Sequence, residues 1–193
     1  MYTWGYIKEN TLSKLNMTEE EANQQNFLSQ FPYYANEAMT QICSAVKPRE
    51  RYYFTAIGDN NVGLVGKMPE DFVSFNDSPI YFKSHSEESY YEVSDDVIEY
   101  LGYNEFLCKA KGFYKIPYNA RWIFFTKDLR NATEIDAPAD VCEAIPSYIA
   151  SQCLKIDDEA KAATYRNEYE MFLARMDDTS IRLQKTFHIG GGW

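Results

Sequence analysis

The chain has 193 residues, a length suited to one domain, or to one core with an inserted subdomain, and too short for two separately cored domains of ordinary size. Hydrophobic residues make up 45% of the sequence, enough for a packed interior, so extensive disorder is excluded. The 16 tyrosines favour sheet faces and protein interfaces over a plain helical bundle. With 19 basic and 29 acidic side chains the net charge is −10, which argues against a general nucleic-acid binder.

The sequence predicts neither a membrane span nor a secretion signal. Its longest strongly apolar run covers residues 122–125, far short of the roughly 20 residues that a spanning helix needs. The first nine residues lack a basic segment followed by an apolar one, so we expect a cytoplasmic protein. The cysteines are scattered without metal-ligand spacing, which favours buried reduced thiols over a zinc site or a disulfide framework. They are Cys43, Cys108, Cys142 and Cys153.

Two helices are expected at the N-terminus, with a capping box between them. Thr3 is a suitable N-cap for a helix ending near Leu15. The run Thr18-Glu-Glu-Glu has the spacing of a capping box. A further helix is predicted from about Pro32 to Val46, because apolar residues recur there at helical spacing before a proline ends the pattern.

From residue 51 the pattern changes to short strands separated by turn residues, which predicts an antiparallel sheet or sandwich. Lys111-Gly112 lies between two aromatic runs and predicts a two-residue hairpin turn. Pro117 cannot donate to a ladder, so its strand is expected to be an edge strand or to end there. The expected strands are residues 51–57, 72–75, 80–83, 90–93, 106–110 and 113–118.

Helical signals return after residue 137. Pro146 is expected to restart a helix there, and a strong amphipathic helix is predicted from about Asp157 to Asp177. The order of helices, sheet and helices predicts an α+β fold in which an antiparallel β-sheet or sandwich is inserted into a helical unit. The predicted parts are a helical domain of residues 1–50 and 137–178, a β domain of residues 51–136, and a C-terminal arm of residues 179–193.

No pattern in the sequence indicates catalysis or a cofactor, so we expect neither. Phosphate-binding glycine loops, nucleophile elbows and zinc-helix motifs do not occur. His85 and His188 lie in polar or terminal sequence and are interpreted as structural. Adjacent carboxylates are frequent, but capping and solvation explain them better than the paired acids of a glycosidase.

Charge is distributed unevenly along the chain. Residues 84–108 carry seven acids and no Lys or Arg, which predicts either a solvated sheet edge or an acidic surface that does not retain DNA. Five of these acids form the candidate acidic patch: Glu87, Glu88, Glu92, Asp95 and Asp96. Residues 179–193 are basic and apolar, and we expect them to bind a partner as an extended arm. The candidate contact residues are Ile181, Arg182, Leu183, Lys185, Phe187, Ile189 and Trp193.

Three stretches of the sequence resemble a known family. They are residues 27–39 (FLSQFPYYANEAM), the C-terminal segments 145–150, 165–170 and 173–177, and the central residues 68–73 (MPEDFV). Together they are similar to head-to-tail adaptor (connector) proteins of tailed bacteriophages, of the tail-tubular type. The resemblance covers the N-terminal helices, the final helix pair and part of the sheet.

The resemblance implies a structural virion protein without catalytic residues. Such a protein binds the portal, forms a ring of commonly about twelve copies and continues the DNA exit channel toward a tail or nozzle protein. DNA would pass without specific binding, no membrane would be involved, and the protein would reside in the virion neck after assembly in the host cytoplasm. Two alternatives remain open: a glycan-binding or glycan-cleaving β module with helical decoration, and a neck or tail-completion protein one layer below the adaptor.

Overall fold

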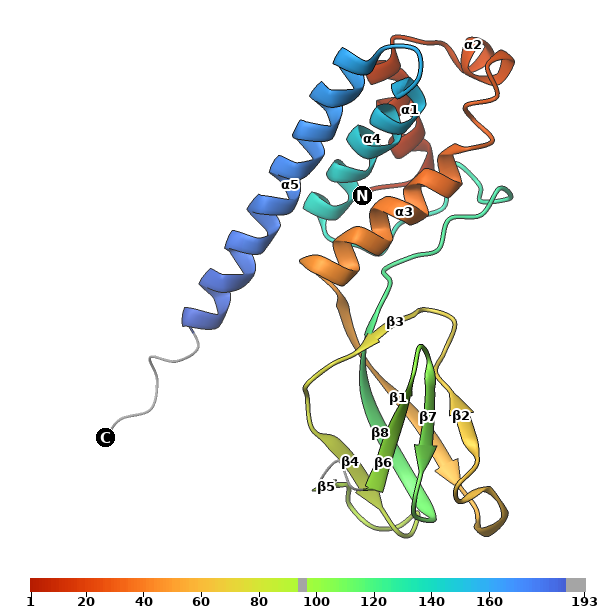
Figure 1. The fold of residues 1–193 in the computed structure, drawn as a ribbon, viewed down its shortest axis with the longest axis vertical. Helices are drawn as coiled ribbons and strands as arrows, with labels where there is room; N and C mark the ends of the chain where they lie inside the picture. Colours follow the sequence, from red (N-terminus) through yellow and green to blue (C-terminus); the bar gives the residue numbers. More distant parts are fainter. Residues whose placement is uncertain (94–96, 187–193) are drawn as a thin grey trace. The chain divides into compact units, whose positions relative to one another are not determined.

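The computed structural model describes residues 1–93 and 97–186, with side chains as far as Met176 in the last helix. The fold is α+β, as predicted (Figure 1). The chain divides into two compact units: a helical unit of residues 1–47 and 122–193, and a β unit of residues 48–121. The chain therefore returns to the helical unit at Trp122, earlier than the expected residue 137.

Local signals form the N-terminal helices of the helical unit. Helix α1 spans Trp4–Leu15, and the Thr3 hydroxyl accepts a hydrogen bond from the Tyr6 backbone N–H at 3.2 Å. Helix α2 spans Glu19–Gln24 and has the expected capping box between Thr18 and Glu21. Helix α3 spans Phe31–Ala45, with a proline in its first turn. The cap and end of α1, the capping box of α2 and the position of α3 agree with the sequence prediction, which expected two helices here and not three.

Helix α4, Ala139–Leu154, is the centre of the helical unit. It packs against α1, α3 and α5, and most of its side chains are buried (Figure 1). The predicted restart at Pro146 is wrong, because α4 runs through this residue without a break. Burial on several sides offsets the backbone hydrogen bond that proline removes, a cost of about 3 kcal/mol in an exposed helix.

Helix α5 spans Glu159–Thr186. The predicted end near residue 177 is wrong, since the backbone continues as a helix for about two more turns. The amphipathic pattern predicts one apolar face for this helix. Of its residues, Ala162, Tyr169 and Met176 are buried, and Tyr165, Phe172 and Leu173 are half-buried.

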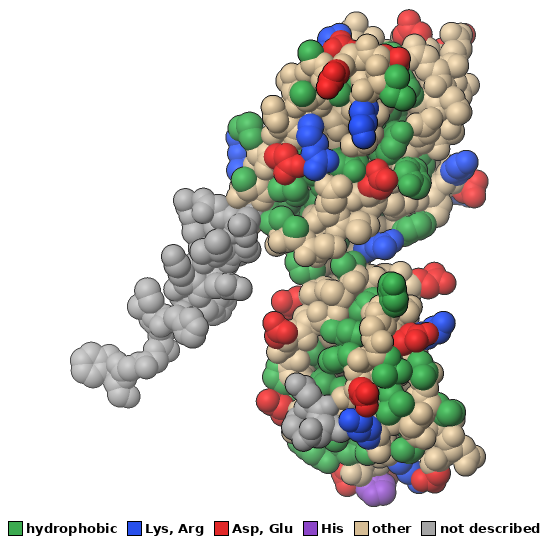
Figure 2. All heavy atoms as spheres, viewed as in Figure 1, with side chains coloured by type: hydrophobic (Ala, Val, Ile, Leu, Met, Phe, Trp, Pro, Cys, Tyr) green, Lys and Arg blue, Asp and Glu red, His purple; other side chains and the backbone are tan. Residues whose placement is uncertain are grey.

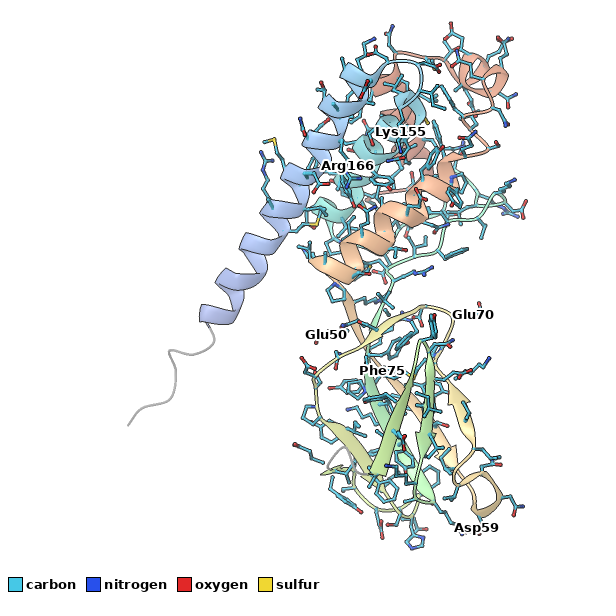
Figure 3. The ribbon with its side chains drawn as sticks, in the orientation of Figure 1. Glu50, Asp59, Glu70, Phe75, Lys155 and Arg166 are labelled. Atoms are coloured by element: carbon cyan, nitrogen blue, oxygen red, sulfur yellow. The ribbon has the colours of Figure 1, made fainter. Side chains whose placement is uncertain are left out.

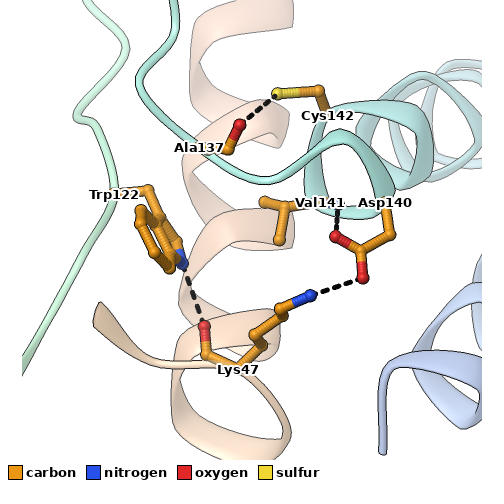
Figure 4. Close-up of polar contacts among 6 residues, drawn as sticks. All are labelled: Lys47, Trp122, Ala137, Asp140, Val141 and Cys142. Carbon is orange, nitrogen blue, oxygen red and sulfur yellow. Dashed lines mark hydrogen bonds and ion pairs between the residues drawn. The ribbon is translucent and has the colours of Figure 1, made fainter. Parts of the chain in front are cut away.

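Residues 122–136 complete the helical unit. Trp4 and Gly5 donate backbone hydrogen bonds to the carbonyls of Thr133 and Asn131 at 3.0 and 2.8 Å. The indole N–H of Trp122 donates to the Lys47 carbonyl at 3.0 Å (Figure 4).

The Lys47 ammonium forms an ion pair with Asp140 at 2.5 Å (Figure 4). The two points at which the β unit joins the helical unit, after Lys47 and before Trp122, therefore lie side by side at the start of α4.

The β unit contains two antiparallel sheets. The larger has the strand order β1-β8-β4-β5, with β3 also paired to β8, and the smaller has the order β2-β7-β6. The strands are β1 Arg49–Ile57, β2 Val65–Lys67, β3 Phe72–Phe75, β4 Ile80–Lys83, β5 Tyr91–Val93, β6 Ile98–Gly102, β7 Glu105–Cys108 and β8 Gly112–Ala120, and a short 3-10 helix, η1, spans Asp59–Asn61.

One face of the larger sheet carries the core of this unit. Residues on the two sheets form one cluster that includes Ile80, Phe106, Tyr114 and Ile116. Along β8 the buried residues Tyr114, Ile116 and Tyr118 alternate with Phe113 and Lys115, which are half-buried. The opposite face of β8 therefore points away from this core.

Two predictions about β8 are wrong. Its strand does not form a hairpin with residues 105–108, because β7 pairs with β2 and β6 in the smaller sheet. Nor is it an edge strand, because β1 pairs along its whole length on one side. On the other side the partner changes from β4, at residues 113–115, to β3, at residues 118–120. Pro117 lies at this change of partner, where its missing N–H interrupts no ladder bond to β4 or β3.

Candidate interaction surfaces

The predicted C-terminal contact residues are only partly described. Residues 181–185 lie in the helical backbone of α5, so the expected extended strand is wrong for this part of the arm. Phe187, Ile189 and Trp193 lie outside the described residues.

The candidate acidic patch lies around β5. Glu87 and Glu92 are exposed, whereas Asp95 and Asp96 lie outside the described residues. Glu88 has a local structural role, since its carboxylate accepts backbone hydrogen bonds from Ser84 and His85 at 3.1 and 3.2 Å. His85 is exposed in the same loop.

The larger sheet presents an aromatic surface on the side opposite the core. The register places Phe54 opposite Lys115, and Lys115 opposite Tyr81, so these side chains form one row across β1, β8 and β4. Phe54 is 61% exposed and Tyr52 41% exposed. We refer to this surface as the lysine–aromatic face, made of Tyr52, Phe54, Tyr81, Lys83, Tyr90, Phe113 and Lys115.

Two lysines lie against the rings of this face. The Lys115 ammonium is 4.0 Å from the ring centroid of Tyr52 and 5.0 Å from that of Tyr81. The Lys83 ammonium is 4.8 Å from the Tyr90 centroid and 5.4 Å from that of Phe113. Such cation–π contacts are worth about 0.5–1 kcal/mol at an exposed site, and more once water is removed. The face thus combines exposed apolar area with two positive charges.

The helical unit carries a second candidate surface, a groove of about 430 Å³ along α3. Tyr33 and Phe124 lie at this groove with 64% and 57% of their surfaces exposed. At its base the Tyr148 hydroxyl accepts from the Gln41 amide at 3.0 Å and donates to Glu37 at 3.3 Å. Tyr and Phe are enriched in protein interfaces, so the two exposed rings favour a contact surface here. Figure 2 shows hydrophobic side chains at the surface of both units.

A second depression, of about 420 Å³, lies between α4 and α5 and is bordered by Lys155 and Arg166 (Figure 3). The Arg166 guanidinium lies 5.3 Å from the ring of Tyr148 and 5.4 Å from that of Tyr169. It also forms an ion pair with Glu170 at 2.5 Å. Arg166 is therefore engaged within its own unit and serves packing there.

Most titratable groups with strongly raised pKa values belong to the two cores; at Tyr2, outside them, the hydrogen bond to Glu143 raises the pKa to about 12. All four cysteines are free and buried, as predicted. Burial raises the pKa of the Cys108, Cys142 and Cys153 thiols from 9.0 to about 12. Burial also raises the pKa of Tyr114 to about 12. Protonated, buried thiols are inert, so these groups stabilise the fold and offer no nucleophile.

Among the side chains of residues 1–93 and 97–176, no cluster of His, Cys, Asp and Glu is placed to hold a metal ion. In the described part of the chain, no helix combines the length and the apolar character that crossing a membrane requires. Comparison with known proteins adds no family: no family model matches the chain, and no curated protein does.

Proposed function

We propose that the chain is a head-to-tail adaptor of a tailed bacteriophage. In this role it binds the portal, forms a ring with copies of itself and continues the DNA exit channel into the tail. The proposal needs surfaces for protein contact instead of an enclosed catalytic pocket. The lysine–aromatic face and the groove along α3 supply surfaces of that kind.

The observation that carries the proposal is where the resembling stretches lie. Residues 31–39 lie in α3, residues 145–150 in α4, and residues 165–170 and 173–177 in α5, whereas the central stretch 68–73 lies in the β unit at the start of β3. The rings of Tyr148 and Tyr169 meet edge to face at 4.9 Å, and the buried Tyr169 hydroxyl donates to the Ala38 carbonyl at 3.1 Å. Stretches more than 100 residues apart in the sequence thus form one three-helix core, as a resemblance based on a common structure requires.

Co-expression with a portal protein from the same genome tests the proposal. We expect the two proteins to copurify and to form rings in negative-stain images, with the chain in a layer on one side of the portal. A neck or tail-completion protein would bind only a portal that already carries another adaptor layer. Binding to a glycan array with no affinity for the portal would refute the proposal and support the carbohydrate module.

A shorter variant tests the C-terminal arm. Because α5 continues to Thr186, a chain that ends there removes residues 187–193 without cutting the described helix. We expect this variant to keep its thermal stability and to lose portal binding. Unchanged portal affinity would exclude these residues from the contact.

A further inference from the structure

The two lysines of the lysine–aromatic face differ from the other lysines of the β unit. Lys67, Lys109 and Lys111 form ion pairs with Glu105, Glu99 and Asp59, at 3.5, 3.4 and 2.7 Å. The ion pairs found in the described part of the chain include neither Lys83 nor Lys115. Their positive charges face aromatic rings, and Lys83 also donates to the Ser86 carbonyl at 2.8 Å.

Two half-buried lysines that form no ion pair with the described carboxylates restrict what can cover this face. A purely apolar partner would strip water from both charges and leave them uncompensated, at a cost of several kcal/mol. A partner that brings carboxylates would replace this water with ion pairs. The surface that docks here must therefore be acidic as well as apolar.

A source of such a surface lies on the same sheet. Glu92 continues the row of Phe54, Lys115 and Tyr81, because the register pairs Tyr81 with Glu92 on the edge strand β5. Tyr81 lies between Glu92 and Lys115, which are two strand spacings or about 10 Å apart along the sheet, and the ion pairs found among the described residues do not join them. Glu87, in the loop before β5, is exposed as well. We call Glu87 and Glu92 the acidic rim.

We propose that the lysine–aromatic face of one copy binds the acidic rim of a second copy. Among the described residues, the lysines of the face and the acids of the rim form no ion pair with one another within one copy, so they form ion pairs between copies. Face and rim lie next to each other on one side of the sheet, so each copy presents both charges to its neighbours. Where the face of each copy contacts the rim of the next, the contact is head-to-tail and generates a ring if its rotation closes. The inference names the contact between copies in the proposed ring and to that extent rests on the proposed function.

Single-stranded nucleic acid fits the same face less well. Base stacking needs free ring faces, but four of the five rings have a lysine ammonium over them. The acidic rim and the net charge of −10 would also repel a phosphate backbone.

Charge reversal tests the proposal on the full chain. One variant carries Lys83→Glu and Lys115→Glu, and the other Glu87→Lys and Glu92→Lys. Each variant places like charges on both surfaces. We therefore expect each variant alone to self-associate at least about tenfold more weakly than the unaltered chain, measured by sedimentation velocity. An equimolar mixture restores opposite charges at the contact, so association should return, as it should in a chain that carries all four changes. Glu88 is left intact because it caps its loop.

A matched control carries Lys127→Glu and Lys155→Glu, two exposed lysines of the helical unit, and should associate like the unaltered chain. Restored association in the mixture would also show that both variants are folded. A chain that stays monomeric at every concentration, or a mixture without restored association, would overturn the proposal. Binding of an oligothymidylate probe that is lost in Lys83→Glu/Lys115→Glu would overturn it in favour of nucleic acid.

Portal binding separates this inference from the proposed function. If the chain binds the portal but charge reversal leaves self-association unchanged, the inference fails and the adaptor proposal stands. If the mixture restores self-association but the chain does not bind the portal, the contact stands and the adaptor proposal fails.

Discussion

Gly112, the first residue of β8, offers the sharpest test of how the β unit is held together. Its φ of +150° is one that side chains rarely adopt. A Cβ at this position would lie 2.6 Å from the Lys83 carbonyl oxygen and 2.4 Å from the Phe82 ring. Because the backbone oxygen belongs to the pairing between β4 and β8, it cannot move without disturbing the register there.

Alanine substitutions at two other glycines separate the cost of backbone strain from the cost of overpacking. A Cβ on Gly63 would meet no atom within 4 Å, but the residue has a φ of +77°, so Gly63→Ala adds backbone strain alone, about 1–2 kcal/mol. Gly58 has open space and a φ of −83°, so Gly58→Ala should stabilise by about 0.5 kcal/mol through the unfolded state. Gly112→Ala adds strain and overpacking, about 2–6 kcal/mol together.

The assay must report on the β unit alone. Residues 48–121 contain no Trp and a single cysteine, Cys108, which is buried. Urea unfolding followed by peptide-resolved labelling of Cys108 therefore measures this unit, while Trp fluorescence follows the helical unit. We expect the order of stability Gly58→Ala, unaltered chain, Gly63→Ala, Gly112→Ala. A loss below about 1 kcal/mol for Gly112→Ala would refute the close approach of β4 and β8 at this residue.

Two further predictions concern buried groups. Tyr169→Phe removes the hydroxyl that donates to the Ala38 carbonyl and should lower the free energy of unfolding by about 1–2 kcal/mol, measured by Trp fluorescence in urea; no change would mean that this hydrogen bond contributes nothing net. The pKa values of the Cys108, Cys142 and Cys153 thiols rise from 9.0 to about 12 on folding, so the folded state keeps protons that the unfolded state releases. The stability from these thiols is complete below pH about 9 and is lost as the pH rises toward 12; a urea midpoint that stays constant over this range would contradict their burial.

The parts of the fold that the sequence predicted depend on local chemistry. Thr3 and Thr18 satisfy backbone N–H groups within three residues, so their caps can be read from spacing alone. The predicted bounds of β3 and β4 match the structure, because turn residues flank both strands. In these elements the determining contacts lie close together in the sequence.

The missed elements depend on distant partners. Strand β2 contains Gly66, where a Cβ would lie 2.5 Å from the Phe106 ring, so its position depends on a residue 40 positions away. The position of Pro117 in the sheet depends on how β8 pairs with β1, β3 and β4, and the sequence does not show which strands pair. The lysine–aromatic face was missed for the same reason: its residues come from four segments, and only the register shows that they share one side of the sheet. Alternating aromatic and lysine residues on the predicted strands were the available signal.

The β unit is inserted into the helical unit through two neighbouring connections, so its surface residues can be substituted without changing the helical core. The insertion leaves after Lys47 and returns at Trp122, and the indole N–H of Trp122 donates to the Lys47 carbonyl. Strands β1 and β8 pair from their outermost residues, Arg49 opposite Ala120, so the two connections run antiparallel from the start. Because both ends of the insertion lie together, closing it costs the helical unit little chain entropy. The buried cluster of the β unit draws on residues between 53 and 120. Substitutions on the lysine–aromatic face can therefore change what the β unit binds without altering the three-helix core of α3, α4 and α5.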